Sequence, residues 1–233
     1  MGGAGDHGAL AVALGAHGFR TRGWVVPAKD AAPRLSDGRA AAAIALIGHA
    51  GGEIWPYFSA WRATQEGIAD PLDSWSKAVI GPIAAEAGGE AVFPSDRPWH
   101  PFQQWAMAAE GLKPSPLGML IHPDYGLWHG YRGAILFGSS VAGRLAETGT
   151  AGRGQVRNHP CDDCADKPCL TACPVGTYTL QGFAVADCRA HLATAAGRQG
   201  CMQAGCLARD ACPVGRSYRY GEAQIRFHMS AFA

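Results

Sequence analysis

The chain has 233 residues, of which 48% are hydrophobic, and its formal net charge is +1 at neutral pH. This length suits one large domain or a medium domain with a small one. A nearly neutral chain without a basic run is not expected to bind nucleic acid. Residues 1–17 lack the pattern of a signal peptide, and no apolar stretch is long enough to span a bilayer. We therefore expect a cytoplasmic protein with no membrane partner.

The first 150 residues alternate helical and strand patterns. Helices are predicted over residues 8–16, 53–64, 71–87 and 101–111, with Pro71 at the start of the third and Gly111 closing the fourth. Strands are predicted over residues 19–26, 41–47 and 91–93. Residues 119–121 and 132–137 are predicted to form a hairpin around Pro123-Asp124-Tyr125-Gly126. Interleaved strands and helices predict an α+β or α/β layered domain.

A change of composition divides the chain near residue 150. All seven tryptophans precede this point and all eight cysteines follow it. The stretch between them, residues 148–154, is rich in glycine and small residues, which is typical of a linker. We expect one domain over residues 1–150 and a small second domain over residues 151–233.

The eight cysteines form two runs that both end in Cys-Pro-Val-Gly. The first is Cys161-x2-Cys164-x4-Cys169-x3-Cys173, the second is Cys201-x4-Cys206-x5-Cys212, and Cys188 stands between them. Such runs are typical of two [4Fe–4S] clusters of the bacterial ferredoxin type, in which the last cysteine of one run binds the other run's cluster. This predicts one cluster on Cys161, Cys164, Cys169 and Cys212, and another on Cys173, Cys188, Cys201 and Cys206. Whether Cys188 binds iron or stays free is left open.

Disulfides and zinc are the two other uses of cysteines in such numbers. Four disulfides would be expected in a secreted protein, but the chain starts without a signal-peptide pattern and its cysteines are confined to one segment. Zinc suits the Cys161-x2-Cys164 spacing, but a tetrahedral zinc site usually pairs two such knuckles and the chain has one. Iron–sulfur clusters are the favoured interpretation. Backbone N–H groups around Val175-Gly176 and Val214-Gly215 are expected to hydrogen-bond the sulfurs and raise the reduction potential.

Three segments before the cysteines carry a family resemblance. Residues 121–133, Ile-His-Pro-Asp-Tyr-Gly-Leu-Trp-His-Gly-Tyr-Arg-Gly, resemble a segment of the cobalamin-processing protein of methylmalonic aciduria type C, and Asp70-Pro71-Leu72-Asp73 resembles its Asp-Pro-Val-Asp segment. Residues 96–112 resemble a helix of epoxyqueuosine reductase, whose cobalamin domain precedes two [4Fe–4S] clusters, a plan that reductive dehalogenases share. The resemblance implies an α+β, nitroreductase-like layered domain that binds base-off cobalamin or a flavin. A small bacterial-ferredoxin-like domain would follow it.

The resemblance and the residues together suggest five further site residues. By resemblance, Trp128 and Arg132 face the corrinoid or its co-substrate, and Asp96 lies next to the position of a general acid. His122 and His129 are candidate axial cobalt ligands or proton donors. Plainer interpretations stay open: a core tryptophan, turn histidines bonded to the backbone, a surface arginine, and an aspartate that caps a helix.

These patterns predict an oxidoreductase that takes electrons from a ferredoxin or flavodoxin and passes them through two clusters to a corrinoid. The outcome would be cobalamin reduction, removal of its upper ligand, or corrinoid-dependent reduction of a small substrate. Residues 113–118 replace a Gly-Trp-Ile-Gly-Lys-Asn segment of epoxyqueuosine reductase, and its helical repeat domain is missing, so tRNA is not an expected substrate. The alternatives are a non-catalytic two-cluster ferredoxin with a docking domain, or a flavin-dependent reductase of the same fold.

Overall fold

The computed structural model describes residues 5–139, 158–179 and 182–233. Two compact units divide the chain. The sheet unit contains residues 5–49, 53–111 and 130–139, and the cysteine unit contains residues 50–52, 112–129, 158–179 and 182–233. The predicted linker at 148–154 lies outside the described residues. The domain expected over residues 1–150 is not one continuous unit, because residues 112–129 belong with the cysteines.

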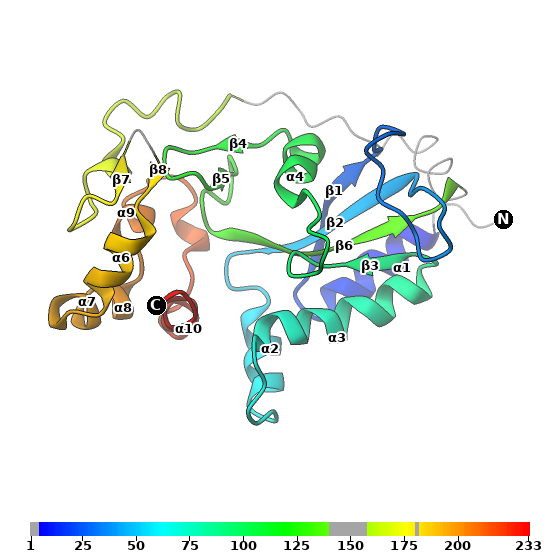
Figure 1. Cartoon of the computed structure of the whole chain (residues 1–233), viewed down its shortest axis with the longest axis horizontal. Helices are drawn as coiled ribbons and strands as arrows, with labels where there is room; N and C mark the ends of the chain where they lie inside the picture. The colour runs from blue at the N-terminus through cyan, green and yellow to red at the C-terminus, as the bar shows by residue number, and fades with distance from the viewer. Residues whose placement is uncertain (1–4, 140–157, 180–181) are drawn as a thin grey trace. The chain divides into compact units, whose positions relative to one another are not determined.

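The sheet unit is built on four strands in the order β1-β2-β6-β3 (Figure 1). Their bounds are β1 (Arg20–Val25), β2 (Ala43–Ala50), β6 (His129–Phe137) and β3 (Glu90–Val92). β1 pairs antiparallel with β2, and β3 pairs antiparallel with β6. Every residue of β2 is buried, as expected of an apolar strand in the middle of a sheet. The antiparallel sheet with its helices confirms the α+β class.

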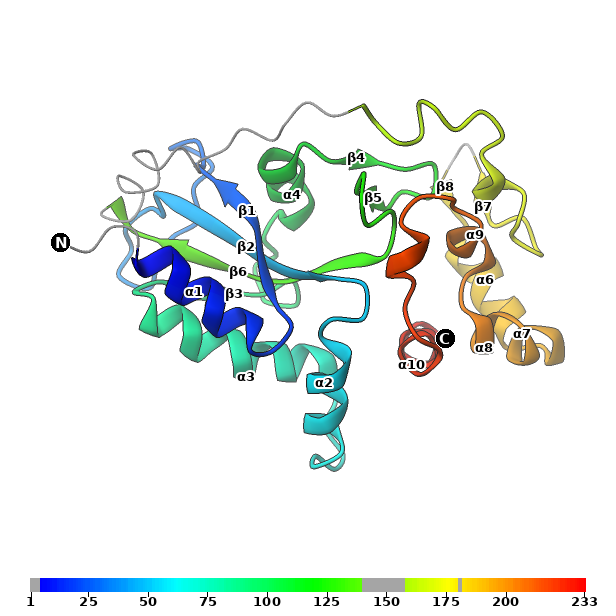
Figure 2. The same cartoon turned by 180° about the vertical axis from the view of Figure 1, so that it is seen from behind.

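Helices cover both faces of this sheet. Figure 2 shows α1 (Gly5–Gly15) and α3 (Pro71–Glu86) on one face and α4 (Phe102–Glu110) on the other, while α2 (Trp55–Arg62) packs against α3. All four agree with the predicted helices to within a few residues. Gly111 closes α4 in the left-handed conformation, as predicted. No helix within the described ranges is both long and apolar enough to cross a membrane.

The predicted hairpin around residues 123–126 is wrong. β5 (Leu120–Ile121) pairs with β4 (Lys113–Pro114), and β6 instead enters the main sheet between β2 and β3. The last five residues of β6 are buried, so this apolar run is stabilised as an inner strand of a larger sheet. The turn itself is closed by a single bridge between His122 and Gly126.

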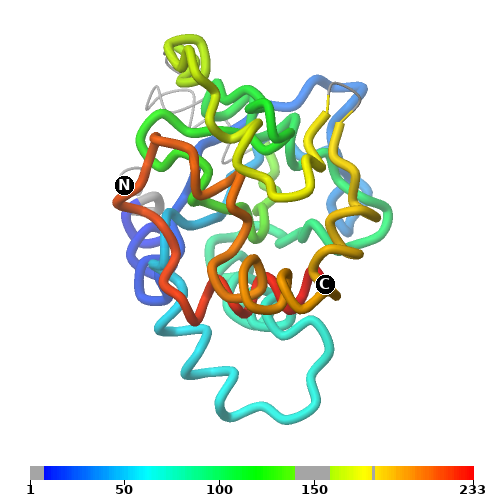
Figure 3. The backbone as a smooth tube through the Cα atoms, turned by 90° about the vertical axis from the view of Figure 1, so that its left-hand side faces the viewer, coloured from blue at the N-terminus to red at the C-terminus, as the bar shows by residue number. Residues whose placement is uncertain are grey.

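The cysteine unit consists of short elements. Beyond β4 and β5 these are η1 (Pro168–Leu170), β7 (Tyr178–Thr179), β8 (Gly182–Phe183), α6 (Val185–Leu192), α7 (Ala195–Gln199), α8 (Cys201–Ala204), α9 (Leu207–Asp210), η2 (Arg216–Tyr218) and α10 (Glu222–Phe232). α8 packs against α7 and α10, and Figure 3 shows the orange and red segments of α8 and α10 side by side. α9 packs against η1.

A close backbone approach ties residues 112–129 to the second cysteine run. Gly126 and Gly215 both have positive φ, at 57° and 70°. A Cβ on Gly126 would lie 2.0 Å from the carbonyl oxygen of Val214, and one on Gly215 would lie 2.2 Å from the carbonyl carbon of Tyr125. Only glycine fits at these two positions, because both the conformation and the space exclude a side chain. The Val-Gly that follows Cys212 is therefore a packing surface for the turn at residues 123–126.

Candidate metal centre

The eight cysteines are free thiols and all lie in the cysteine unit. Burial raises the pKa of Cys161 to about 11, and the neighbouring thiols that raise it further are those of Cys212, Cys169 and Cys164. Burial also raises the pKa of Cys188, and the neighbouring thiols of Cys206, Cys173 and Cys201 raise it further. The thiols thus form a first set of Cys161, Cys164, Cys169 and Cys212 and a second set of Cys173, Cys188, Cys201 and Cys206.

The first set is built where η1 meets α9. Cys169 lies within η1, and Cys212 follows α9 by two residues. Both thiols are buried in an apolar cluster with Leu117, Ile121, Leu127 and Ala208. Residues 112–129 therefore supply one wall of this set, which explains why the segment belongs to the cysteine unit.

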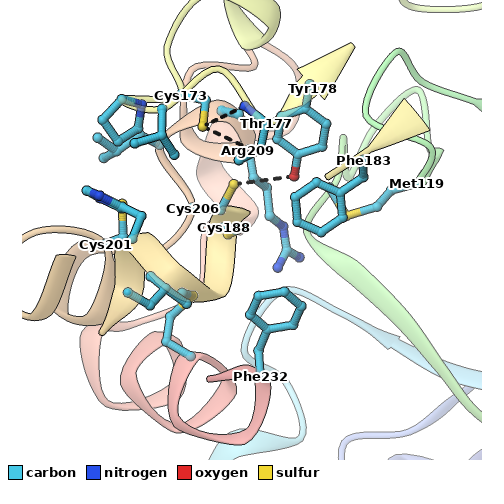
Figure 4. A pocket seen from close by; sticks show the side chains of 17 residues that line it. Met119, Cys173, Thr177, Tyr178, Phe183, Cys188, Cys201, Cys206, Arg209 and Phe232 are labelled. Carbon is cyan, nitrogen blue, oxygen red and sulfur yellow. Dashed lines mark hydrogen bonds between the residues drawn. The ribbon is translucent and has the colours of Figure 1, made fainter. Parts of the chain in front are cut away.

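The second set lines a cavity of about 210 Å³ (Figure 4). Two of its thiols come from helices, Cys188 from α6 and Cys201 from the start of α8, and two lie outside helices, Cys206 directly before α9 and Cys173 in the first Cys-Pro-Val-Gly. The other lining side chains are mostly apolar. Cys188, whose role the sequence left open, is grouped with the other three thiols.

Hydrogen bonds converge on the sulfur of Cys173. The hydroxyl oxygen of Thr177 lies 3.2 Å from this sulfur, and the backbone N–H of Thr177 donates to it at 3.5 Å. Burial acts to raise the pKa of Cys173, but these bonds and the backbone N–H groups of Val175 and Gly176 outweigh it, so the pKa is lowered. The backbone N–H that bonds this sulfur belongs to Thr177, directly after Val175-Gly176, while the N–H of Gly176 bonds the carbonyl oxygen of Cys173; hydrogen bonds from Val214-Gly215 to a sulfur stay a prediction.

Two more polar side chains face the second set. The hydroxyl of Tyr178 lies 3.6 Å from the sulfur of Cys206, and Nε2 of His191 lies 3.8 Å from that of Cys201. Burial raises the pKa of Tyr178, and the neighbouring Cys206 raises it further. Sequence reasoning missed both residues. Only the position of Tyr178 directly after Cys-Pro-Val-Gly-Thr offered a signal.

Each set offers four thiols in apolar surroundings, which suits a four-iron cluster. In the part of the chain that the structure describes, no three His, Cys, Asp or Glu side chains lie close enough to hold a single metal ion. That finding does not conflict with clusters. A zinc ion draws its sulfurs to about 2.3 Å from one centre, whereas a cluster keeps its ligands on four separate irons.

Three of the other predicted site residues lie in the cysteine unit and have structural partners. Trp128 is 3% exposed, and the Arg209 guanidinium lies 4.2 Å from its ring centroid. Nδ1 of His122 accepts backbone N–H bonds from residues 124 and 125, at 3.0 and 3.2 Å. Nε2 of His129 lies 3.1 Å from the carbonyl oxygen of Leu120. These contacts are those of the plainer interpretations, a core tryptophan and turn histidines.

The remaining two predicted residues lie in the sheet unit. Arg132 forms an ion pair with Asp73. Asp96 accepts the backbone N–H of residue 93 at 3.0 Å and pairs with Lys77 at 2.7 Å, so it caps the turn after β3 and not a helix. Arg132 is 18% exposed at its side chain, which is more buried than an ordinary surface arginine. The five residues are divided three to two between the units.

A buried charged network in the sheet unit was not predicted. Arg22 is 4% exposed; its Nε lies 3.0 Å from the Glu110 carboxylate, and it donates to the carbonyl oxygen of His49 at 3.0 Å. Tyr131 also donates to Glu110. Burial raises the pKa of Glu110 although Arg22 and Tyr131 act to lower it. The network links α4 to β1 within the sheet unit, whereas the cysteines belong to the other unit.

In comparisons with known proteins, no protein-family model matches this chain, and no curated protein sequence matches it. The resemblance to cobalamin enzymes therefore rests on the segments between residues 70 and 133 and on the order of the two parts of the chain, over roughly residues 70 to 215. The interpretation of the cysteines rests on their spacing and on the two thiol sets.

Proposed function

We propose that this protein is an iron–sulfur oxidoreductase that holds one [4Fe–4S] cluster on each thiol set. The observation that carries the proposal is the placement of the free thiols: Cys173, Cys188, Cys201 and Cys206 line one cavity, and Cys169 and Cys212 share an apolar cluster against which Cys161 packs. This placement is the one that ligand exchange between two ferredoxin-type runs requires. Bound clusters would supply one-electron transfer at each site.

The chain's own residues would prepare these sites for electron transfer. The second cavity has a mostly apolar lining, and the backbone N–H of Thr177 stabilises negative charge on the Cys173 sulfur. Leu117, Ile121 and Leu127 shield the first set in the same way. Burial and hydrogen bonding are two of the ways in which a protein adjusts the reduction potential of a cluster.

We further propose a corrinoid as the electron acceptor, bound by a nitroreductase-like sheet unit, and a ferredoxin or flavodoxin as the donor. The support is the resemblance over residues 70–133 and the α+β sheet with helices on both faces. Arg132, with Asp73 beside it, is the candidate binding residue of this unit. Asp96 is its candidate proton donor. In this proposal the corrinoid itself is reduced or loses its upper ligand.

A non-catalytic two-cluster ferredoxin, in which the sheet unit is a docking domain, is the second candidate. The observation that favours it is the engagement of Trp128, His122 and His129 in contacts of the cysteine unit. Residues used in this way contribute to packing in the unit that holds the thiols.

Titration of the reconstituted protein with hydroxocobalamin separates the candidates. The protein is loaded anaerobically with iron and sulfide, and visible and EPR spectra follow the cobalamin. A base-off spectrum that converts to Co(I) when the clusters are reduced supports the corrinoid reductase. Unchanged spectra with full iron content contradict it and leave the ferredoxin; tight binding of flavin would instead favour the flavin reductase.

Paired cysteine substitutions test the two cluster sites. The variant Cys161→Ser/Cys212→Ser removes two ligands of one set, whereas Cys161→Ser/Cys201→Ser removes one ligand from each. We expect the first variant to keep one cluster, about four iron atoms per chain, and the second to have both sites impaired. Equal iron loss in the two variants would contradict the assignment of ligands to sets.

A further inference from the structure

The two thiol sets differ in the side chains that face their sulfurs. The hydroxyls of Thr177 and Tyr178 face Cys173 and Cys206 of the second set (Figure 4). Among the residues that the structure describes, no hydroxyl or imidazole lies within hydrogen-bonding distance of a first-set thiol. When a cysteine sulfur is bound to iron as a thiolate, it can only accept, so a facing hydroxyl must donate.

The fold holds the Tyr178 hydroxyl in place. Tyr178 faces Phe183 across the β7–β8 pair, and their rings stack with centroids 4.8 Å apart. Phe183 in turn stacks on Phe232 of α10, with centroids 6.1 Å apart. Thr177, which precedes the strand, is 2% exposed. The Tyr178 ring is therefore held by stacking, and the Thr177 hydroxyl is buried.

The charged residues near the two sets differ as well, although Asp187 precedes Cys188 of the second set and Lys167 acts on Cys161 of the first. The loop between Cys161 and Cys169 carries three aspartates, at positions 162, 163 and 166, and one lysine, Lys167. The side chains that line the second cavity include Arg209, and none of them is acidic. Negative charge near a cluster disfavours the electron that reduces it, whereas positive charge favours it.

We propose that Thr177 and Tyr178 are tuning residues that give the second set the higher reduction potential of the two cluster sites. The inference rests on the proposed function, since it concerns clusters on both sets. Hydrogen bonds to a ligand sulfur stabilise the reduced, more negative state of a cluster and raise its potential. An electron delivered to the protein by a low-potential iron–sulfur or flavin donor therefore rests on the site of Cys173, Cys188, Cys201 and Cys206.

The test is a redox titration of the loaded full-length protein, followed by EPR at one fixed pH because His191 also faces the second set. The variants are Tyr178→Phe and Thr177→Val, which remove a hydroxyl and keep the shape of the side chain. Matched controls are Tyr57→Phe, in the sheet unit, and Thr171→Val, whose hydroxyl bonds the carbonyl oxygen of residue 168 beside the first set. Iron content and circular dichroism check folding and loading.

We expect each variant to lower the higher of the two midpoint potentials and to leave the lower one unchanged, while the controls move neither. Full iron loading with both potentials unmoved, or a shift of the lower potential alone, would overturn the inference and leave the proposed function standing. Failure of the wild-type chain to load two clusters would overturn both.

Discussion

The sheet unit and the cysteine unit differ in what fills their interiors. Eleven of the twelve largest fully buried side chains among the described residues belong to the sheet unit, and only Ile121 belongs to the other. The buried residues of the cysteine unit include three thiols, and its helices α7 to α9 have only four or five residues. Helices this short are not stable by themselves. The sheet unit is thus stabilised by apolar burial, whereas we expect the cysteine unit to depend on what its thiols bind.

Iron removal is the strongest way to test this contrast. We expect chelation of the loaded protein to abolish amide-exchange protection in α6 to α10, because metal binding contributes folding free energy where the core is small. Strands β1, β2 and β6 are expected to keep their protection. Hydrogen exchange read by mass spectrometry measures both units in one sample. Unchanged protection of α8 and α10 would show that the cysteine unit folds without its clusters.

Loss of the buried Arg22 would weaken the sheet unit alone. Arg22→Met removes the cation beside the partly buried Glu110 carboxylate, which Tyr131 still bonds, and we expect this to cost about 1–3 kcal/mol of the free energy of unfolding. The double variant Arg22→Met/Glu110→Met is expected to recover part of that cost. Urea unfolding followed by tryptophan fluorescence measures these changes.

The exposed Arg39, which pairs with Asp37, provides the control for that experiment. Arg39→Met is expected to leave the unfolding midpoint nearly unchanged, because exposed ion pairs contribute little. A cost at Arg22 no larger than at Arg39 would contradict the role of the buried network.

A glycine pair probes the cysteine unit in the same manner. Gly126→Ala places a Cβ against the carbonyl oxygen of Val214, whereas Gly118→Ala, also at positive φ, meets nothing within 4 Å. We expect a loss of more than about 1 kcal/mol and lower cluster yield for Gly126→Ala, beyond the strain that both variants share. Iron content and thermal unfolding check this. Equal effects in the two variants would argue against the close backbone approach.

The smallest predicted effect is a pH dependence that comes from Glu110. Burial raises the pKa of Glu110 above its ordinary value of 4.5, so the folded state holds this proton more tightly than the unfolded state. Its contribution to stability is therefore complete below the ordinary pKa and is lost as the pH rises through the raised one. The free energy of unfolding of the wild type, relative to Glu110→Gln, should fall as the pH rises above the ordinary value of 4.5. A constant or rising difference would contradict the raised pKa.

The elements of the sheet unit followed closely from local patterns. Apolar periodicity, Pro71 at a helix start and Gly111 at a helix end each act within a few residues, so the sequence predicts them well. Local patterns did not predict which strands β6 pairs with, because a long apolar strand pairs where its side chains are best buried. In this chain the partner is a strand some 80 residues earlier, as the contact of Gly130 with Gly48 shows.

Sequence alone shows the two cysteine runs with their shared Cys-Pro-Val-Gly ending, and the proposed exchange of ligands between two clusters rests on that local pattern. Only the tertiary structure assigned Cys188 to a set, turned Thr177 and Tyr178 toward the sulfurs, and placed residues 112–129 beside the first set. The reason is the separation in sequence between the residues involved. Ligand spacing is a local property of the chain, whereas these contacts form between segments that come together only when the unit packs.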